Sequence, residues 1–295
     1  MKNRVNKSIC IILPFIVLFL FSHATAQQEY MRAFDGLFYK YRGLANYNKG
    51  QYDQAISDFN KTLEIYPRHD NAYFYRGLAY YHKAQYGQAI SDFNKTLEIY
   101  PRHDNVYFYR GLAYFKMSQF DQAILDFNKT LEINPGFTEA YQYRGLIYFK
   151  MRQYDQAILN FNKVLSINQN DAYIYCLRGR VYGEKGQHDL AISDYTTALK
   201  INPKYDDAYF YRGLANYHKG NYGQAISDYT KAIEINPEDG GFYYARGEIY
   251  YLKKEYDKSW EDVKKVQSLG YPIHPKFLNN LLEAVGKKSE TPPLN

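Results

Sequence analysis

Cysteine is almost absent from this chain, with Cys10 and Cys176 as the two examples in 295 residues. Cys10 lies in an apolar run that we expect to be removed, so a single thiol remains. One thiol excludes an internal disulfide framework, and the spacing of Cys and His residues that binds zinc is missing. We therefore expect no metal site, and interpret Cys176 as a buried inert thiol, with pairing between two molecules as the alternative.

An excess of charge is also missing. The whole chain has a formal net charge of +6, but residues 1–26 contain three basic and no acidic side chains, so +3 remains without them. Binding to nucleic acid depends on a strongly basic surface that neutralises phosphates. The near-neutral balance therefore predicts that nucleic acid is not a partner.

Long apolar runs are absent except at the N-terminus. Lys2, Arg4 and Lys7 precede an apolar run of 13 residues, 9–21, and Ala24-Thr25-Ala26 follows it. A helix needs roughly 20 apolar residues to span a bilayer, so this run is too short for a stable anchor. The pattern predicts a signal peptide at 1–26, cleaved near Ala26. We expect an exported protein, periplasmic or secreted, with no stable membrane insertion after cleavage.

A catalytic constellation is not visible either. Cys176 and His188 could act as thiol and base, but we place them at opposite ends of one helix, about 18 Å apart at 1.5 Å per residue. No cofactor motif accompanies them. The sequence therefore predicts a protein that is not an enzyme and that uses no cofactor.

What the chain does contain is a strict repeat, in which glycine recurs every 34 residues. An arginine precedes each of these glycines, and a tyrosine lies three residues before the arginine. The glycines are Gly43, Gly77, Gly111, Gly145, Gly179, Gly213 and Gly247. A fixed period of this length is typical of an array of small units that bury their faces against one another.

Seven repeats follow if each begins seven residues before its glycine. Repeats one to seven are 36–69, 70–103, 104–137, 138–171, 172–205, 206–239 and 240–273. Apolar residues recur every three or four positions in two stretches of each repeat, with a polar turn such as 83–85 between them, so each repeat is predicted to be a helical hairpin. Asp35 and Asp104 are expected to cap the helices that follow them.

The segments outside the repeats have simpler predictions. Residues 27–35 form a short N-terminal lead-in. Residues 274–286 contain an amphipathic helix that begins at a proline and is expected to cap the last repeat. Residues 287–295 are expected to be a flexible tail.

The pattern of these residues resembles the tetratricopeptide repeat. The matching residues of repeat two are Tyr73, Gly77, Tyr80, Tyr86, Ala89, Phe93 and Pro101. The resemblance implies an all-α, right-handed superhelical solenoid of seven helix-turn-helix units with a capping helix. This chain departs from the family pattern in having tyrosine in place of tryptophan at position 4 and arginine in place of leucine at position 7.

The arginine at position 7 requires a partner. Aspartate occupies position 23 in six repeats and Asn160 replaces it in repeat four. We predict that the two side chains form a hydrogen-bonded pair between the two helices of each repeat. We also predict that glycine at position 8 allows close approach of the second helix, because a larger side chain there would overpack the hairpin.

In the family, the inner side of the first helices lines a concave groove, and this resemblance implies a binding site at positions 5, 9, 12 and 13. The candidate groove residues are Phe74, Leu78, Tyr81, His82, Phe108, Leu112, Phe115, Phe210, Leu214 and Tyr217. Repeat five breaks this aromatic strip with Arg180 and Glu184, beside Cys176 and Gly183. We expect this polar gap to orient a charged group of a partner.

The predicted function is a non-enzymatic scaffold that binds a peptide or helix of another protein in this groove, in envelope assembly or secretion. The alternatives are glycan binding on the same aromatic strip, rings that complete the core instead of binding, and end-to-end stacking of arrays.

Overall fold

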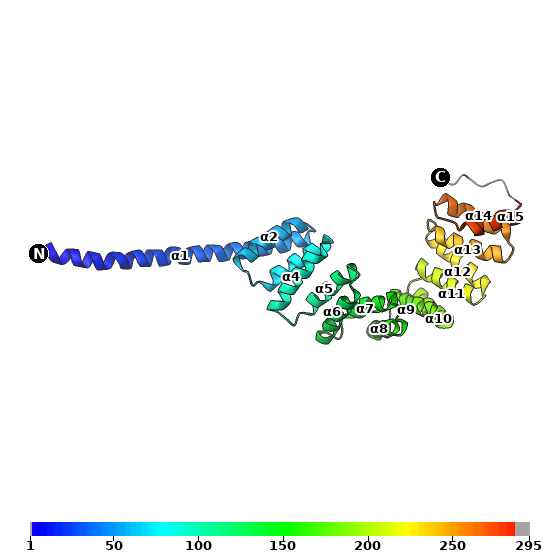
Figure 1. Cartoon of the computed structure of the whole chain (residues 1–295), viewed down its shortest axis with the longest axis horizontal. Helices are drawn as coiled ribbons and strands as arrows, with labels where there is room; N and C mark the ends of the chain where they lie inside the picture. Colours follow the sequence, from blue (N-terminus) through cyan, green and yellow to red (C-terminus); the bar gives the residue numbers. More distant parts are fainter. Residues whose placement is uncertain (1, 287–295) are drawn as a thin grey trace. The chain divides into compact units, whose positions relative to one another are not determined.

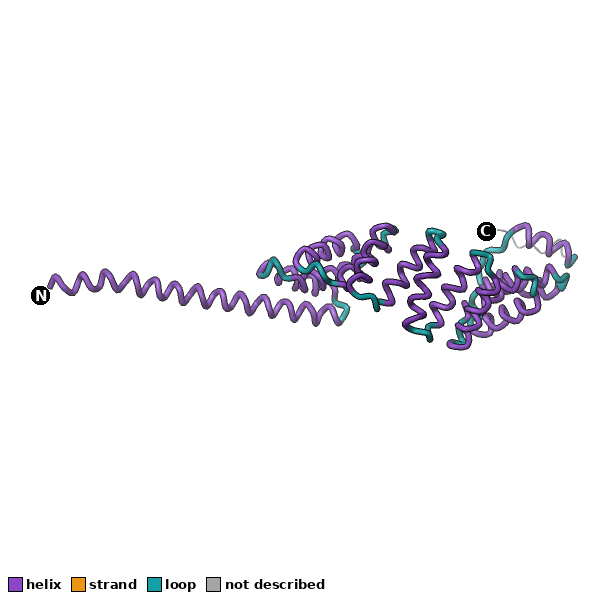
Figure 2. Tube along the Cα trace, turned by 90° about the horizontal axis from the view of Figure 1, so that it is seen from below, coloured by secondary structure: helices purple, strands orange, loops and turns teal. Residues whose placement is uncertain are grey.

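The computed structural model describes the backbone of residues 2–286 and the side chains of residues 25–286. Within this stretch of the chain the regular structure is helical, with fifteen helices and no strand (Figure 1, Figure 2). The predicted tail at 287–295 lies outside the described residues. Most side chains of the predicted signal peptide, residues 1–26, also lie outside the described residues, so its cleavage stays a prediction. None of the helices, as far as they are described, is long and apolar enough to cross a membrane.

The helices follow one another as hairpins that match the seven predicted repeats. Their bounds are α1 Lys2–Asn48, α2 Tyr52–Ile65, α3 Asp70–His82, α4 Tyr86–Ile99, α5 Asp104–Lys116, α6 Phe120–Ile133, α7 Thr138–Lys150, α8 Tyr154–Ile167, α9 Ala172–Glu184, α10 His188–Ile201, α11 Asp206–His218, α12 Tyr222–Ile235, α13 Gly240–Leu252, α14 Tyr256–Ser268 and α15 Pro275–Ala284. The chain forms two compact units, the N-terminal unit of residues 1–140 and the C-terminal unit of residues 141–295, and each is described separately.

The turn inside each hairpin has the same backbone conformation in every repeat. Position 15 has a positive φ, which glycine adopts without strain, as at Gly186 with φ of 74°. In four repeats this position is not glycine, and Ala84, for example, has a φ of 57°. The hairpin therefore imposes this left-handed conformation even on residues that disfavour it.

The prediction of close approach at position 8 is confirmed. A Cβ atom on Gly111 would lie 2.9 Å from Cε1 of Phe127, a fully buried ring on the second helix of the same repeat. Equivalent glycines meet the ring at position 24 in the same way in repeats one to six. Glycine is therefore needed here because the ring occupies the space of a side chain.

The predicted arginine–aspartate pairs are also confirmed. In six repeats the Nε and Nη2 atoms of the arginine donate to the two carboxylate oxygens of the aspartate over 2.5 to 3.0 Å. In repeat four, Arg144 Nε donates to Asn160 Oδ1 over 2.8 Å. These paired hydrogen bonds hold the two helices of a hairpin at a fixed distance.

A third contact of the same arginine was not predicted from the sequence. Arg76 Nη1 donates to Asn60 Oδ1 over 2.6 Å, and Arg110 Nη1 donates to Asn94 Oδ1 over 2.6 Å. The acceptor is at position 25 of the preceding repeat, and the same contact recurs at Arg178, Arg212 and Arg246. Each of these arginines therefore binds two repeats together.

Two of the predicted helix caps are wrong. Asp35 lies inside α1, because residues 27–35 contain no glycine or proline that would interrupt the helix. Asp104 is the first residue of α5 and His103 is the N-cap, so the Asp104 carboxylate instead accepts a hydrogen bond from Asn134 Nδ2 over 3.0 Å. Asp171 and Asp239 do cap α9 and α13.

The capping helix is confirmed as α15. Its Leu281 and Leu282 are buried against Trp260 and Val263 of α14. The predicted proline stands at its N-terminal end. The apolar side of the last repeat is thereby covered.

Replacing Gly111 with valine should lower the free energy of unfolding by about 1–3 kcal/mol, because its Cβ would overlap the Phe127 ring. Urea unfolding followed by circular dichroism measures this effect. Gly87→Ala is the matched control, since a Cβ on helical Gly87 meets nothing within 4 Å. Equal stability of Gly111→Val and the wild type would contradict this account of position 8.

Replacing Asp126 with alanine should destabilise the protein by about 2 kcal/mol, because the half-buried Arg110 guanidinium loses both of its charge-assisted hydrogen bonds within the repeat. Asp126→Asn should cost less, since Asn160 fills this position naturally in repeat four. The double variant Arg110→Met with Asp126→Leu should regain part of the loss, because no buried charge remains unpaired. A double variant less stable than Asp126→Ala, by the same urea assay, would show this reasoning to be wrong.

Candidate functional site

Four of the predicted groove residues in the N-terminal unit belong to the core. Phe74, Leu78, Phe108 and Leu112 are only 4 to 8% exposed. The Phe108 ring lies 5.8 Å from the Phe127 ring and 4.7 Å from the Phe137 ring. The prediction of an open groove surface is therefore wrong for these four side chains. At position 5, the end of each repeat covers the ring, as His103 does for Phe74 and Phe137 does for Phe108.

Other predicted groove residues remain partly open. Tyr81 and Phe115 are half-buried, and His82 is exposed. The His82 imidazole stacks on the Tyr52 ring at 5.0 Å and lies within hydrogen-bond distance of the Tyr47 hydroxyl, at 3.1 Å. In the C-terminal unit, the predicted groove residues Phe210, Leu214 and Tyr217 are all half-buried. The accessible strip therefore consists mainly of positions 12 and 13, near the C-terminal ends of the first helices.

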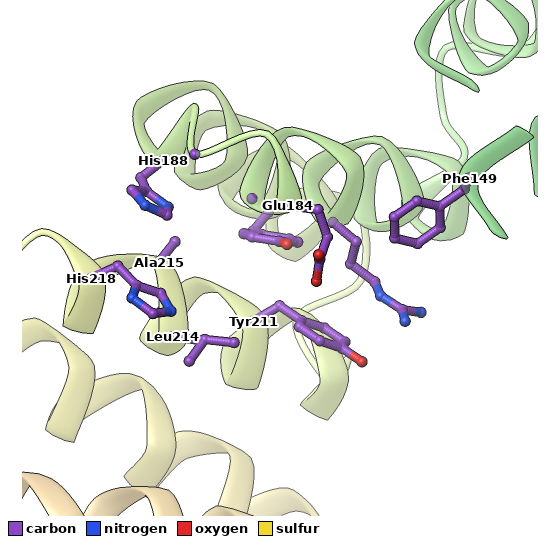
Figure 3. A pocket seen from close by; sticks show the side chains of 11 residues that line it. Phe149, Glu184, His188, Tyr211, Leu214, Ala215 and His218 are labelled. Atoms are coloured by element: carbon purple, nitrogen blue, oxygen red, sulfur yellow. The ribbon is translucent and has the colours of Figure 1, made fainter. Parts of the chain in front are cut away.

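A cavity of the C-terminal unit coincides with the polar gap predicted in repeat five. It has a volume of about 500 Å³ and lies between α9 and α11 (Figure 3). The residues that line it are Phe149, Arg180, Gly183, Glu184, Gly186, His188, Tyr195, Tyr211, Leu214, Ala215 and His218. The structure thus brings together Arg180, Glu184 and Leu214 from the predicted set. We call this cavity the repeat-five pocket.

The pocket exists because repeat five lacks an aromatic ring. Position 12 is tyrosine or phenylalanine in the other six repeats and glycine, Gly183, in repeat five. A Cβ atom on Gly183 would meet only the Tyr195 hydroxyl, at 3.8 Å. The volume that a ring occupies elsewhere is therefore empty here.

Arg180 is the only arginine or lysine among the residues that line the pocket. Its guanidinium carbon lies 4.6 Å from the centre of the Tyr211 ring and 5.7 Å from that of Phe149, so the side chain is held between two rings. Among the residues that the structure describes, no carboxylate forms an ion pair with Arg180. Stacking covers the faces of a guanidinium and leaves its N–H groups able to bind an anion.

Two histidines form the other side of the pocket. The rings of His188 and His218 stack at 5.2 Å with an interplanar angle of 13°. Nδ1 of His188 is buried and has no hydrogen-bond partner among the described residues. His188 replaces the tyrosine or phenylalanine found at position 17 of the other repeats. Three residues that line the pocket were not predicted as a binding site from the sequence, namely Phe149, His188 and Tyr211. For His188 the sequence does carry a signal, because an alignment of the repeats shows the change at position 17.

The thiol near the pocket is not a nucleophile. Burial raises the pKa of Cys176 to about 12, so the thiol stays protonated at neutral pH. The predicted placement of Cys176 and His188 on one helix is wrong, because α9 ends at Glu184 and His188 begins α10 after the turn at Gly186. Within the described residues, no group of three or more His, Cys, Asp or Glu side chains could bind a metal.

Family comparison agrees with the repeat pattern. Models described as tetratricopeptide repeat match residues 42–104, 105–137, 127–158 and 206–239, and one described as TPR repeat matches 145–186 and 179–220. Together these matches extend from residue 42 to residue 239. The search of curated proteins found no match.

Solved structures of tetratricopeptide repeat proteins are similar to this chain. The C-terminal part of a protein from Cytophaga hutchinsonii has a TM-score of 0.71 at 20% identity, over 82% of this chain and 99% of that one. A protein from Parabacteroides merdae has a TM-score of 0.63 at 19% identity, over 85% and 99% of the two chains. YrrB, described as a TPR protein with an unusual peptide-binding site, has a TM-score of 0.56 at 21% identity, over 66% and 97%.

Helical hairpins at the predicted positions, family matches across 42–239 and similar solved structures lead to one conclusion. The chain belongs to the tetratricopeptide repeat family.

Proposed function

We propose that this chain is a non-enzymatic scaffold that binds a peptide or helix of a partner protein along the inner side of its first helices. The repeat-five pocket is the observation that carries this proposal, because it is an open cavity at an inner position that is filled in the other repeats. Tetratricopeptide repeats are typically interaction modules, and one structural relative is described as having a peptide-binding site.

The pocket favours a partner segment with an acidic side chain next to apolar ones. The guanidinium of Arg180 can donate hydrogen bonds to a carboxylate, and a charge-assisted bond of this kind is stronger than a neutral one. Leu214 lines the same pocket and offers an apolar contact. The carboxylate of Glu184, one helical turn from Arg180, repels a segment that is negatively charged throughout, so it adds selectivity.

The place of action that we propose is the cell envelope or the space outside the cell. This element of the proposal depends on residues 1–26, whose basic start, apolar run and small-residue site are typical of an export signal. Envelope assembly or secretion would provide partner proteins in that location.

A glycan is the second candidate ligand, because sugars also bind to pockets that combine aromatic rings with charged side chains. One observation makes it the weaker candidate. The Arg180 guanidinium already lies over the Tyr211 ring at 4.6 Å, and Tyr195 is almost fully buried, so neither ring presents an open face for a sugar.

Selection of peptides from a random phage-displayed library tests the proposed function. The wild-type chain should enrich peptides with an acidic residue beside aromatic or aliphatic ones. Arg180→Leu restores the leucine of neighbouring repeats, and Gly183→Tyr restores the missing ring. Each should weaken binding of the selected peptides about tenfold or more, since the charged hydrogen bond or the cavity is lost.

The control variant is Arg102→Leu, which removes an exposed positive charge far along the sequence from the pocket. It should bind the selected peptides as the wild type does. Equal binding by wild type, Arg180→Leu and Gly183→Tyr, or no enrichment at all, would rule out the pocket as a peptide site. If soluble saccharides displaced the bound phage, the result would favour a glycan over a peptide as the ligand.

A further inference from the structure

A second surface of the chain, outside the repeat-five pocket, lies on α1. Six large apolar side chains of this helix are 46 to 72% exposed, and most of them recur at intervals of three and four residues. They are Tyr30, Met31, Phe34, Leu37, Phe38 and Tyr41. We call them the α1 stripe. An apolar patch of this extent is unusual on the surface of a monomeric protein and marks an interaction site.

The stripe faces away from α2. On the opposite side of α1, a Cβ atom on Gly43 would meet the ring of Phe59 on α2. A Cβ atom on Gly36 would meet the ring of Tyr66, the residue directly after α2. The charged residues Arg32 and Arg42 also reach toward α2, where they bond the Glu64 carbonyl oxygen and the Asp58 carboxylate. The outward face of α1 is therefore mainly apolar.

The same face is covered by another helix in the following repeats. Positions 3 and 10 are Ala72 and Ala79 in repeat two, and Val106 and Ala113 in repeat three, all at most 1% exposed. The second helix of the preceding repeat packs against these first helices. The corresponding residues of α1 are Phe38 and Ala45, and neither is buried. Thus α1 has the face of an internal repeat, but no helix among the described residues covers it.

Among the described residues, Arg42 lacks the hydrogen bond to a preceding helix that other position 7 arginines form. In five other repeats, Nη1 of the position 7 arginine donates to an asparagine or threonine of the preceding second helix. Arg42 uses Nε and Nη2 for Asp58, and within the described residues its Nη1 has no acceptor. The arriving helix should therefore bring a hydrogen-bond acceptor as well as apolar side chains.

We infer that the occupant is α1 of a second copy of this chain, packed antiparallel about a two-fold axis near Phe38. In this arrangement Phe38 meets its own counterpart, Tyr41 meets Phe34 of the second copy, and the large Tyr30 lies opposite the small Ala45. Asp35 lies two turns before Arg42 on α1. The antiparallel symmetry therefore places the Asp35 carboxylate of each copy beside the free Nη1 of the other.

The area is sufficient for a stable dimer. A large side chain buries about 150–250 Å² when fully covered, so six half-exposed ones offer on the order of 600 Å² per copy. Two copies together bury roughly 1,200 Å², which exceeds the ~1,000 Å² expected of a biological interface. An apolar stripe is complementary to itself, as a two-fold interface requires.

The test uses the full chain purified from an exporting host, with its N-terminus read by mass spectrometry. Light scattering after size-exclusion chromatography should give the mass of two copies for the wild type and of one copy for Phe38→Glu. Asp35→Arg should weaken the dimer about tenfold, because it places a positive charge beside Arg42. Leu125→Glu changes an exposed leucine of α6 and should remain dimeric.

Cross-linking provides a second measurement that does not depend on a destabilising charge. The Phe38→Cys variant should form a disulfide-linked dimer on mild oxidation, and Leu125→Cys should not. The native Cys176 is buried and does not compete. A single-copy mass for the wild type at all concentrations would overturn the inference, as would a dimer that survives Phe38→Glu or fails to cross-link at residue 38. Binding of a wild-type monomer to phosphatidylcholine vesicles would overturn it too, and would identify the stripe as a lipid-facing surface.

Discussion

The side chain on which the whole array depends is the arginine at position 7. A repeat protein has no common core, so every contact between neighbours has to be stabilised locally. The arginine does this with one planar group, because Nε and Nη2 bind the aspartate of its own second helix and Nη1 reaches the second helix of the preceding repeat. Its guanidinium also lies over the position 4 tyrosine, at 5.4 Å in repeat two. A leucine at this position would fill the space but would fix no distance or direction.

This framework explains why the inner side of the first helices can vary. The hairpin is held by Arg110, Gly111, Asp126 and Phe127 and their equivalents, which lie where the two helices meet. Positions 9, 12 and 13 take no part in these contacts. Arg180 and Gly183 could therefore replace a leucine and a ring without loss of the fold, and the cost is limited to a cavity that a ligand can fill.

The sequence predicted well whatever depends on contacts inside one repeat. The helices, the close approach at Gly111 and the arginine–aspartate pairs all follow from spacing within 34 residues. Contacts between repeats were harder, because their register is not encoded in periodicity. The bond from Arg110 to Asn94, for example, depends on how two repeats stack. The burial of Phe108 is an exception inside one repeat, because the ring that covers it, Phe137, lies after the second helix, where helical periodicity does not place it. The Asp35 cap failed for another reason, since nothing in residues 27–35 ends the helix.

Four of the changes that distinguish repeat five lie around the pocket. Residues 51–71 and 85–105 differ at a single position, Asp53 against Gly87, so these repeats have diverged little. Repeat five keeps the framework residues Tyr175, Arg178, Gly179 and Asp194. Its departures include positions 9, 12, 13 and 17, and the structure places all four around one cavity. These four changes bring the charge of Arg180 and the space left by Gly183 to one place, which is the combination that the proposed ligand requires.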